Sequence, residues 1–118
     1  MDNFRFTKWK VYIDSKDLVK EVLKNYNTFP FVIKRSLGEQ LLRSVISIPL
    51  NIAEGSGKNS DKELNRFINI SIGSAYETFA NLDILRDNEF INEKEFLEIY
   101  NKIDNIVKQL GGFKKKLG

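Results

Sequence analysis

The residue types that most often carry catalysis are scarce in this chain of 118 residues. It contains no histidine and no cysteine, which excludes disulfides, thiolate chemistry, histidine-based proton transfer and the commonest metal ligands. Serines are plentiful, but the sequence places no histidine or suitable lysine beside them to activate a nucleophile. We therefore expect a protein that is not an enzyme and needs no metal or cofactor.

The segment Gly55-Ser56-Gly57-Lys58 has the composition of a phosphate-binding loop but not its spacing. That loop needs glycine at position 52 and serine or threonine at position 59, where this chain has Ile52 and Asn59. A phosphate-binding loop also follows a strand, whereas an amphipathic helical pattern precedes this segment. We interpret the segment as a turn between helices, where Lys58 and the free amides of the next helix still favour an anion.

Glu54 and Glu77 both lie among small and apolar residues, so we expect both to be partly buried. Two inward glutamates can hold a metal, but the di-iron bundles also supply histidine three residues after glutamate. A salt bridge is the better interpretation, because a buried carboxylate without a partner costs several kcal/mol. The candidate partners are Arg43, Arg66 and Arg86. We predict that Arg43, Asn51, Glu54 and Glu77 form one polar network between the second and third helices.

Four amphipathic segments position these residues. Apolar residues recur every three or four positions from about Lys8 to the end of the chain, and no alternating strand pattern is convincing. Ser60 with Glu63, and Asn92 with Glu95, have the spacing of helix-capping boxes. Pro49 lies inside the second segment, where we expect a bend rather than an end. The predicted helices cover residues 8–27, 31–55, 61–88 and 92–113.

Short connections between such long helices force neighbours to run antiparallel. The sequence therefore predicts one all-α domain over residues 1–118, an antiparallel up-down-up-down four-helix bundle with both termini at one end. No apolar run has the length of a signal peptide or a membrane span. We expect a cytoplasmic protein that does not enter a membrane.

The charge of the chain is mildly basic, with a net charge of +3 and a pI near 9.1. A lysine-rich last segment and the turn near residue 58 are the candidate nucleic-acid contacts. The alternative is a frayed helix end whose cations complement the helix dipole, and nearby exposed aromatic residues would favour a protein partner instead. The candidate contacts are Lys58, Lys108, Lys114, Lys115 and Lys116.

The run from Ser47 to Gly55, Ser-Ile-Pro-Leu-Asn-Ile-Ala-Glu-Gly, is the most specific motif in the chain. Together with Glu63–Phe67 and Gly73–Glu77, it resembles the four-helix-bundle proteins encoded in intervening sequences of bacterial 23S ribosomal RNA genes. The resemblance covers nearly the whole chain. The motif residues singled out are Arg43, Asn51, Glu54, Gly55, Gly73, Ser74 and Glu77.

The resemblance implies a homopentamer around a central channel and no enzymatic activity. Related accessory proteins of diversity-generating retroelements bind a reverse transcriptase and nucleic acid, so RNA binding is implied by analogy. The alternative function is a protein–protein scaffold or accessory subunit without nucleic-acid contact. Ile33 and Leu42 stand where the family often has glutamate and arginine, which removes one acid and one base from that surface.

Overall fold

The computed structural model describes residues 2–118, and all regular structure within them is helical. The all-α prediction is confirmed. The elements are a 3-10 segment η1 (Asp2–Lys8), α1 (Lys10–Tyr26), α2 (Phe31–Ile33), a π-helical turn η2 (Lys34–Gly38), α3 (Glu39–Ser56), α4 (Asp61–Asp87) and α5 (Glu93–Leu117).

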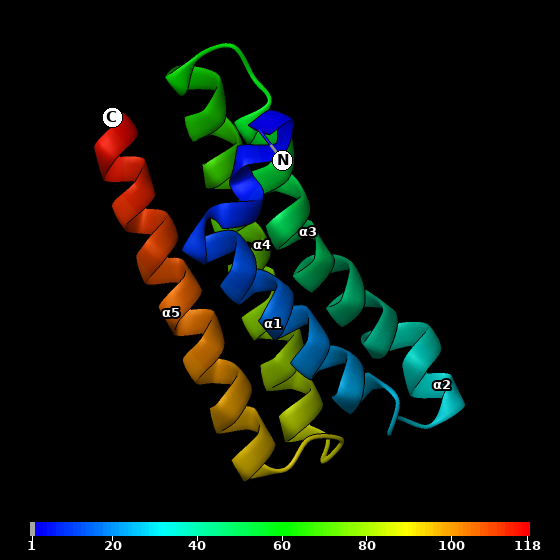
Figure 1. Ribbon diagram of the computed structural model, residues 1–118. Coiled ribbons are helices and arrows are strands. Elements are labelled where there is room, and N and C mark those ends of the chain that lie inside the picture. The colour runs from blue at the N-terminus through cyan, green and yellow to red at the C-terminus, as the bar shows by residue number, and fades with distance from the viewer. Residues whose placement is uncertain (1) are drawn as a thin grey trace.

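Four long helical stretches make up the molecule, because α2, η2 and α3 follow one another without a break. Successive stretches run in opposite directions, and the N- and C-termini lie toward the same end (Figure 1). Contacts join α1 to α3, α3 to α4, α4 to α5 and α5 back to α1. The result is an elongated body of 43 × 23 × 19 Å.

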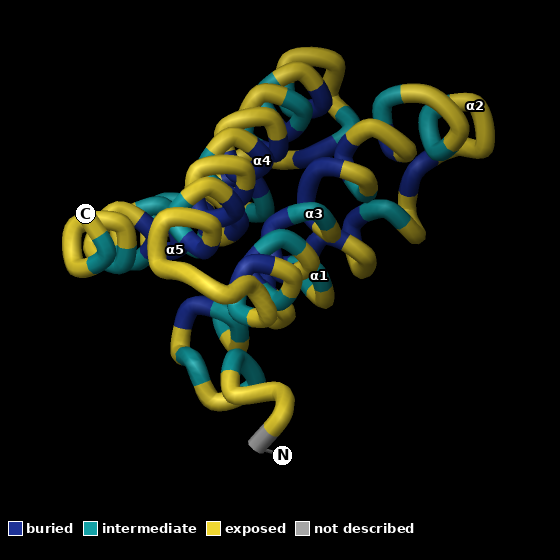
Figure 2. Tube along the Cα trace, turned by 90° about the horizontal axis from the view of Figure 1, so that it is seen from above, coloured by how far each residue is buried: buried dark blue, intermediate teal, exposed yellow. Residues whose placement is uncertain are grey.

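The core forms along the side of each helix where apolar residues recur every three or four positions. Figure 2 shows the buried positions turned toward the inside and the exposed positions around the outside. Burying each of these side chains contributes roughly 1.5–3 kcal/mol. The largest fully buried side chains are Leu18, Val22, Leu41, Val45, Ile48, Ile52, Ile68, Leu82, Leu85, Ile99, Ile106 and Leu110.

The two predicted capping boxes differ in the structure. Asn92 accepts a hydrogen bond from the Glu95 amide at 2.8 Å, and Glu95 accepts one from the Asn92 amide at 3.2 Å, so this box is complete. Ser60 caps α4 by accepting from the Glu63 amide at 3.2 Å. The Glu63 carboxylate binds Arg66 at 2.9 Å instead of returning to the cap. The prediction of a capping box at Ser60 and Glu63 is therefore confirmed for the Ser60 cap but not for the return hydrogen bond to Glu63.

The last helix extends further than its sequence indicates. The pattern predicts an end near residue 113 with fraying at Gly111 and Gly112, but α5 continues to Leu117. Tertiary packing explains the difference, because the Phe113 ring lies against Trp9 with their centroids 5.0 Å apart and Leu117 packs on the core. These contacts outweigh the poor helix propensity of two glycines.

The long helix that carries the Ser47–Gly55 motif continues through Pro49, as predicted. Its irregular turn lies earlier, at η2. There a Cβ on Gly38 would come within 2.9 Å of the Ile33 carbonyl oxygen and 3.0 Å of the Tyr26 ring. Glycine is thus required where α1 passes closest to this turn. Every helix within residues 2–118 is too short or too polar to span a membrane.

Candidate functional site

The structure does not join the four side chains predicted to form a polar network. Arg43 is exposed and lies 3.9 Å from Glu39 of its own helix, and Glu54 lies 3.9 Å from Lys58. Glu77 is exposed and forms no ion pair within residues 2–118. The predicted network is wrong, and so is the predicted burial of the two glutamates. Each glutamate stands two positions beyond a buried residue, about 200° around the helix from it.

Short polar side chains make the contact between α3 and α4 instead. We call these contacts the α3–α4 seam. The Ser47 and Ser74 hydroxyls share a hydrogen bond of 2.8 Å, and Asn51 donates to the Ser47 hydroxyl at 2.8 Å. Deeper in the seam, Thr78 donates to the Ser44 hydroxyl at 3.1 Å. Of the predicted network, only Asn51 takes part.

Glycine at position 55 allows the two helices to approach closely at the end of the seam. A Cβ there would lie 2.7 Å from the Phe67 Cβ and 3.0 Å from the Leu64 Cδ1. Gly73 differs, because it is exposed and a Cβ would meet nothing within 4 Å. Gly55 and Ser74 of the motif therefore serve the packing of this chain, whereas no contact among residues 2–118 requires Gly73.

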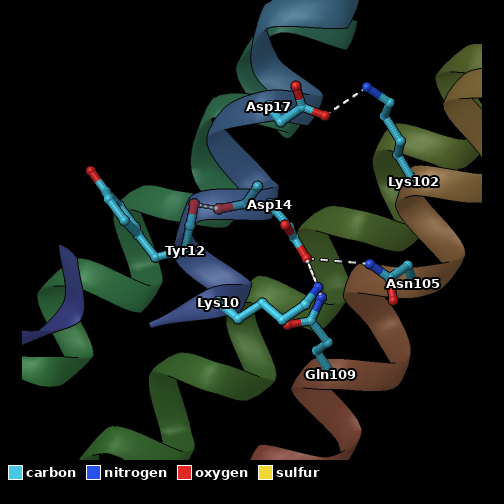
Figure 3. A network of polar contacts seen from close by, with 8 residues as sticks. Lys10, Tyr12, Asp14, Asp17, Lys102, Asn105 and Gln109 are labelled. Atoms are coloured by element: carbon cyan, nitrogen blue, oxygen red, sulfur yellow. Dashed lines mark hydrogen bonds and ion pairs between the residues drawn. The ribbon is translucent and has the colours of Figure 1, made fainter. Parts of the chain in front are cut away.

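A second polar network, absent from the sequence predictions, fastens α1 to α5 (Figure 3). The Asp14 carboxylate accepts hydrogen bonds from Gln109 at 2.6 Å, from Asn105 at 3.3 Å and from Lys10 of its own helix. One turn further along α1, Asp17 accepts a hydrogen bond of 2.6 Å from Lys102 of α5.

The charges of this network shift two ionisation equilibria. Partial burial alone would raise the pKa of Asp14, but the hydrogen bonds from Lys10, Gln109 and Asn105 outweigh it, so the pKa lies below the ordinary value of 3.8. The hydrogen bond to Asp17 raises the pKa of Lys102 above its ordinary value of 10.5. Both groups stay charged at neutral pH. The arrangement is that of a structural clamp, since its charges satisfy one another.

The five predicted nucleic-acid contacts fall on two elements. Lys108 lies on α5 and binds Asp104 at 2.9 Å, a hydrogen bond that raises the pKa of the lysine. Lys58 lies in the α3–α4 connection, with its ammonium 5.2 Å from the centre of the Phe67 ring. The remaining three, Lys114 to Lys116, are exposed in the last turn of α5.

Packing brings these two elements and the N-terminal segment to one end of the molecule (Figure 1). Arg5 of η1 donates to the Ser56 carbonyl oxygen at 3.3 Å, which ties the N-terminal segment to the end of α3. The Trp9–Phe113 contact ties it to α5. We call residues 2–10, 57–66 and 108–118 together the basic end.

Charge is divided unequally between the basic end and the rest of the chain. The basic end holds ten of the nineteen basic residues but three of the sixteen acidic residues, and three acids just outside its bounds, Asp14, Glu54 and Asp104, pair with Lys10, Lys58 and Lys108. The remainder of the chain is net acidic. The mild overall charge of +3 conceals this separation. The basic residues are Arg5, Lys8, Lys10, Lys58, Lys62, Arg66, Lys108, Lys114, Lys115 and Lys116.

Groups of three or more carboxylates placed to hold a metal ion are not found within residues 2–118. The fold and surface together define a class, an all-helical protein with one basic end. Residues 7–112 match the family described as 23S rRNA-intervening sequence protein. The chain belongs to this family, which confirms the resemblance carried by its Ser47–Gly55 motif.

A solved structure supports the same assignment. It is a protein of unknown function from the S23 ribosomal protein family of Bacteroides thetaiotaomicron VPI-5482. The two chains are 25% identical and superpose with a TM-score of 0.80 over 89% of this chain and 98% of the other. A comparison with curated proteins gives no match.

Proposed function

We propose that this chain is a non-enzymatic binding protein of the cytoplasm, an up-down-up-down four-helix bundle that assembles with copies of itself and binds RNA through its basic end. The separation of charge carries this proposal. Ten basic residues from three distant segments gather at one end, while the rest of the chain has an excess of acid. Such a patch attracts phosphates and releases their counterions.

The resemblance to the family, which implies a homopentamer, supports the self-assembly. Exposed apolar residues outside the basic end favour such contacts, among them Leu50, Ile70 and Ile84 with 60%, 40% and 45% of their surface exposed. RNA binding and self-assembly thus use different surfaces of the chain.

The test compares two triple variants that remove the same charge. Lys114→Ala/Lys115→Ala/Lys116→Ala removes cations from the basic end, and Lys34→Ala/Arg35→Ala/Lys94→Ala removes them elsewhere. We expect the first to weaken binding of a single-stranded RNA and to lower the slope of log affinity against log salt by about 2, at roughly 0.7 per lost phosphate contact. The second leaves the slope unchanged. Equal effects, or affinity independent of salt, would refute the RNA proposal.

The second candidate is a protein–protein scaffold or accessory subunit without nucleic-acid contact. The exposed aromatic Phe4, 55% exposed beside the basic residue Arg5, favours it. An assembled protein that fails to bind RNA even at low salt would support the scaffold over the RNA-binding protein. The ratio of nucleic-acid to protein absorbance in the purified sample is a first test of RNA binding, because copurified nucleic acid raises this ratio.

A further inference from the structure

A shallow apolar groove lies between α1 and α3, away from the basic end. Leu23, Ile46 and Leu50 contribute exposed apolar surface to it, with 40%, 37% and 60% of each residue accessible. Lysines of α1 line its edge, and none of the residues that line the groove is acidic. An exposed apolar strip edged by one sign of charge is typical of a surface that binds a protein segment of the opposite sign.

The lysines of the groove are not neutralised within the chain. Three lysines recur at intervals of four along α1, Lys16, Lys20 and Lys24, and they form no ion pair within residues 2–118. The Lys16 ammonium lies 5.1 Å from the centre of the Tyr12 ring. The acids of α1 face the other way, since Asp17 binds Lys102 of α5. Helix α1 therefore presents acid to α5 and uncompensated base to the groove.

The outer side of α4 carries the opposite chemistry. Six exposed residues recur there at alternating intervals of three and four, which places them in one row along the helix. We call this row the α4 stripe: Ile70, Gly73, Glu77, Ala80, Ile84 and Asp87.

Two features of the α4 stripe suit it to contact with other helices. The carboxylates Glu77 and Asp87 form no ion pair in the described part of the chain. Gly73 costs about 1 kcal/mol in an exposed helix relative to alanine, and no neighbour in the described part of the chain requires it. A glycine in this setting is useful where another backbone approaches from outside.

We infer that the α4 stripe of one copy packs into the α1–α3 groove of a second copy. This inference rests on the self-assembly included in the proposed function. Lys16 and Lys24 lie about 12 Å apart along α1, and Glu77 and Asp87 about 15 Å apart along α4, at 1.5 Å per residue. The two pairs of unpaired charges therefore match in sign and nearly in spacing. The apolar floor, which offers nothing to a phosphate, favours this occupant over RNA.

The two surfaces also lie at the same height of the molecule. Ile46, on the groove, neighbours Ser47, whose hydroxyl bonds to Ser74 beside Gly73 of the stripe. Helices α1 and α4 run in the same direction (Figure 1). Copies related by rotation about an axis parallel to the helices can thus join without an axial shift. Because the two surfaces differ, the contact is heterologous; it gives a ring if the rotation between copies closes and a filament if it does not.

Charge reversal tests the pairing by sedimentation velocity. We expect the wild-type chain to sediment as an assembly, and both Lys16→Glu/Lys24→Glu and Glu77→Lys/Asp87→Lys to sediment as monomers at the same concentration. The chain that combines all four substitutions regains assembly, because its reversed stripe fits its reversed groove. The control Lys34→Glu/Lys94→Glu lowers the net charge as much as Lys16→Glu/Lys24→Glu does, and we expect it to assemble normally.

Gly73→Leu separates a lost contact from a lost fold. Position 73 is exposed, and a Cβ there meets nothing within 4 Å among residues 2–118, so we expect helical circular dichroism to stay at the wild-type level while the assembly dissociates. A wild-type assembly that survives every reversal and Gly73→Leu overturns the pairing but leaves self-assembly standing. A wild-type chain that remains monomeric at all concentrations overturns both the pairing and the self-assembly. Monomeric single reversals with no recovery in the combined chain also reject the pairing.

Discussion

Replacing Gly55 by alanine should destabilise the protein, because it adds a methyl group at the narrowest point between α3 and α4. The new Cβ would lie 2.7 Å from the Phe67 Cβ, whereas ordinary contact begins at 3.4 Å. The shortfall of about 0.7 Å cannot be relieved by rotating a side chain, since a Cβ is fixed by its backbone. The helices must separate, which disturbs the α3–α4 seam.

The expected loss follows from two opposing effects. Overpacking of this kind costs typically 1–3 kcal/mol. Alanine recovers at most about 1 kcal/mol through its helix propensity, and less here because Gly55 stands next to the last residue of α3. The free energy of unfolding should therefore fall by about 1–2 kcal/mol, and the Tm by roughly 4–8 °C.

Urea denaturation followed by circular dichroism measures this loss, with Gly111→Ala as the matched control. A Cβ at Gly111 meets nothing within 4 Å, so this substitution should be neutral or stabilise the fold by up to about 1 kcal/mol. Both variants are compared at one protein concentration, because assembly makes apparent stability depend on concentration. A Gly55→Ala protein as stable as Gly111→Ala would refute the close-packed seam.

Three further predictions concern polar side chains. Glu54→Ala should change the free energy of unfolding by less than about 0.5 kcal/mol in urea denaturation, because its exposed carboxylate has only a distant lysine partner; a loss of several kcal/mol would contradict this placement. Ser74→Ala should cost about 1 kcal/mol in the same assay, since Ser47 loses its partner across the seam, and no loss would contradict the shared hydrogen bond. Asp14→Asn should cost roughly 1 kcal/mol at pH 7. Because the folded pKa of Asp14 lies below 3.8, its stabilisation is present above about pH 3.8 and lost as the pH falls through the folded pKa. The free energies of unfolding of the wild-type chain and of Asp14→Asn should therefore converge in acid. A constant difference between them from pH 7 to pH 2 would reject the stabilising role of the Asp14 carboxylate.

Local signals predicted most of the helical elements. The Asn92–Glu95 capping box and the turn before Ser60 depend on residues within four positions of one another, so a reading of the sequence finds them. Continuation of α5 through Gly111 and Gly112 depends instead on Trp9, which is a hundred residues away. Propensity alone therefore ends that helix too early.

The misplaced glutamates illustrate a different limit. Small, apolar neighbours suggested burial, but the spacing of buried residues already placed Glu77 with exposed Gly73 and Ala80 rather than with buried Ala75. Helical phase was the better guide here. Neither neighbouring residue types nor helical phase could predict the Asp14–Gln109 hydrogen bond. It depends on how α1 and α5 are rotated against each other, and its two residues are 95 positions apart in the sequence.

Self-assembly and RNA binding become linked if the ring forms as inferred. Copies related by rotation about an axis parallel to the helices all turn their basic ends to the same face. That face presents several cationic patches to one RNA, and linked contacts raise overall affinity by roughly 100-fold or more without any new contact. A single chain offers only one patch.

The monomer created by Gly73→Leu tests this link, because it keeps all ten basic residues of the basic end. We expect it to bind a short oligonucleotide, which reaches one patch, as tightly as the wild-type chain does. A long RNA that spans several patches should bind it roughly 100-fold more weakly than it binds the ring. Fluorescence anisotropy with both RNAs at one salt concentration measures the two affinities. Equal loss for the short and long RNAs would place Gly73 within the RNA contact itself, and no loss for either would show that the patches act independently.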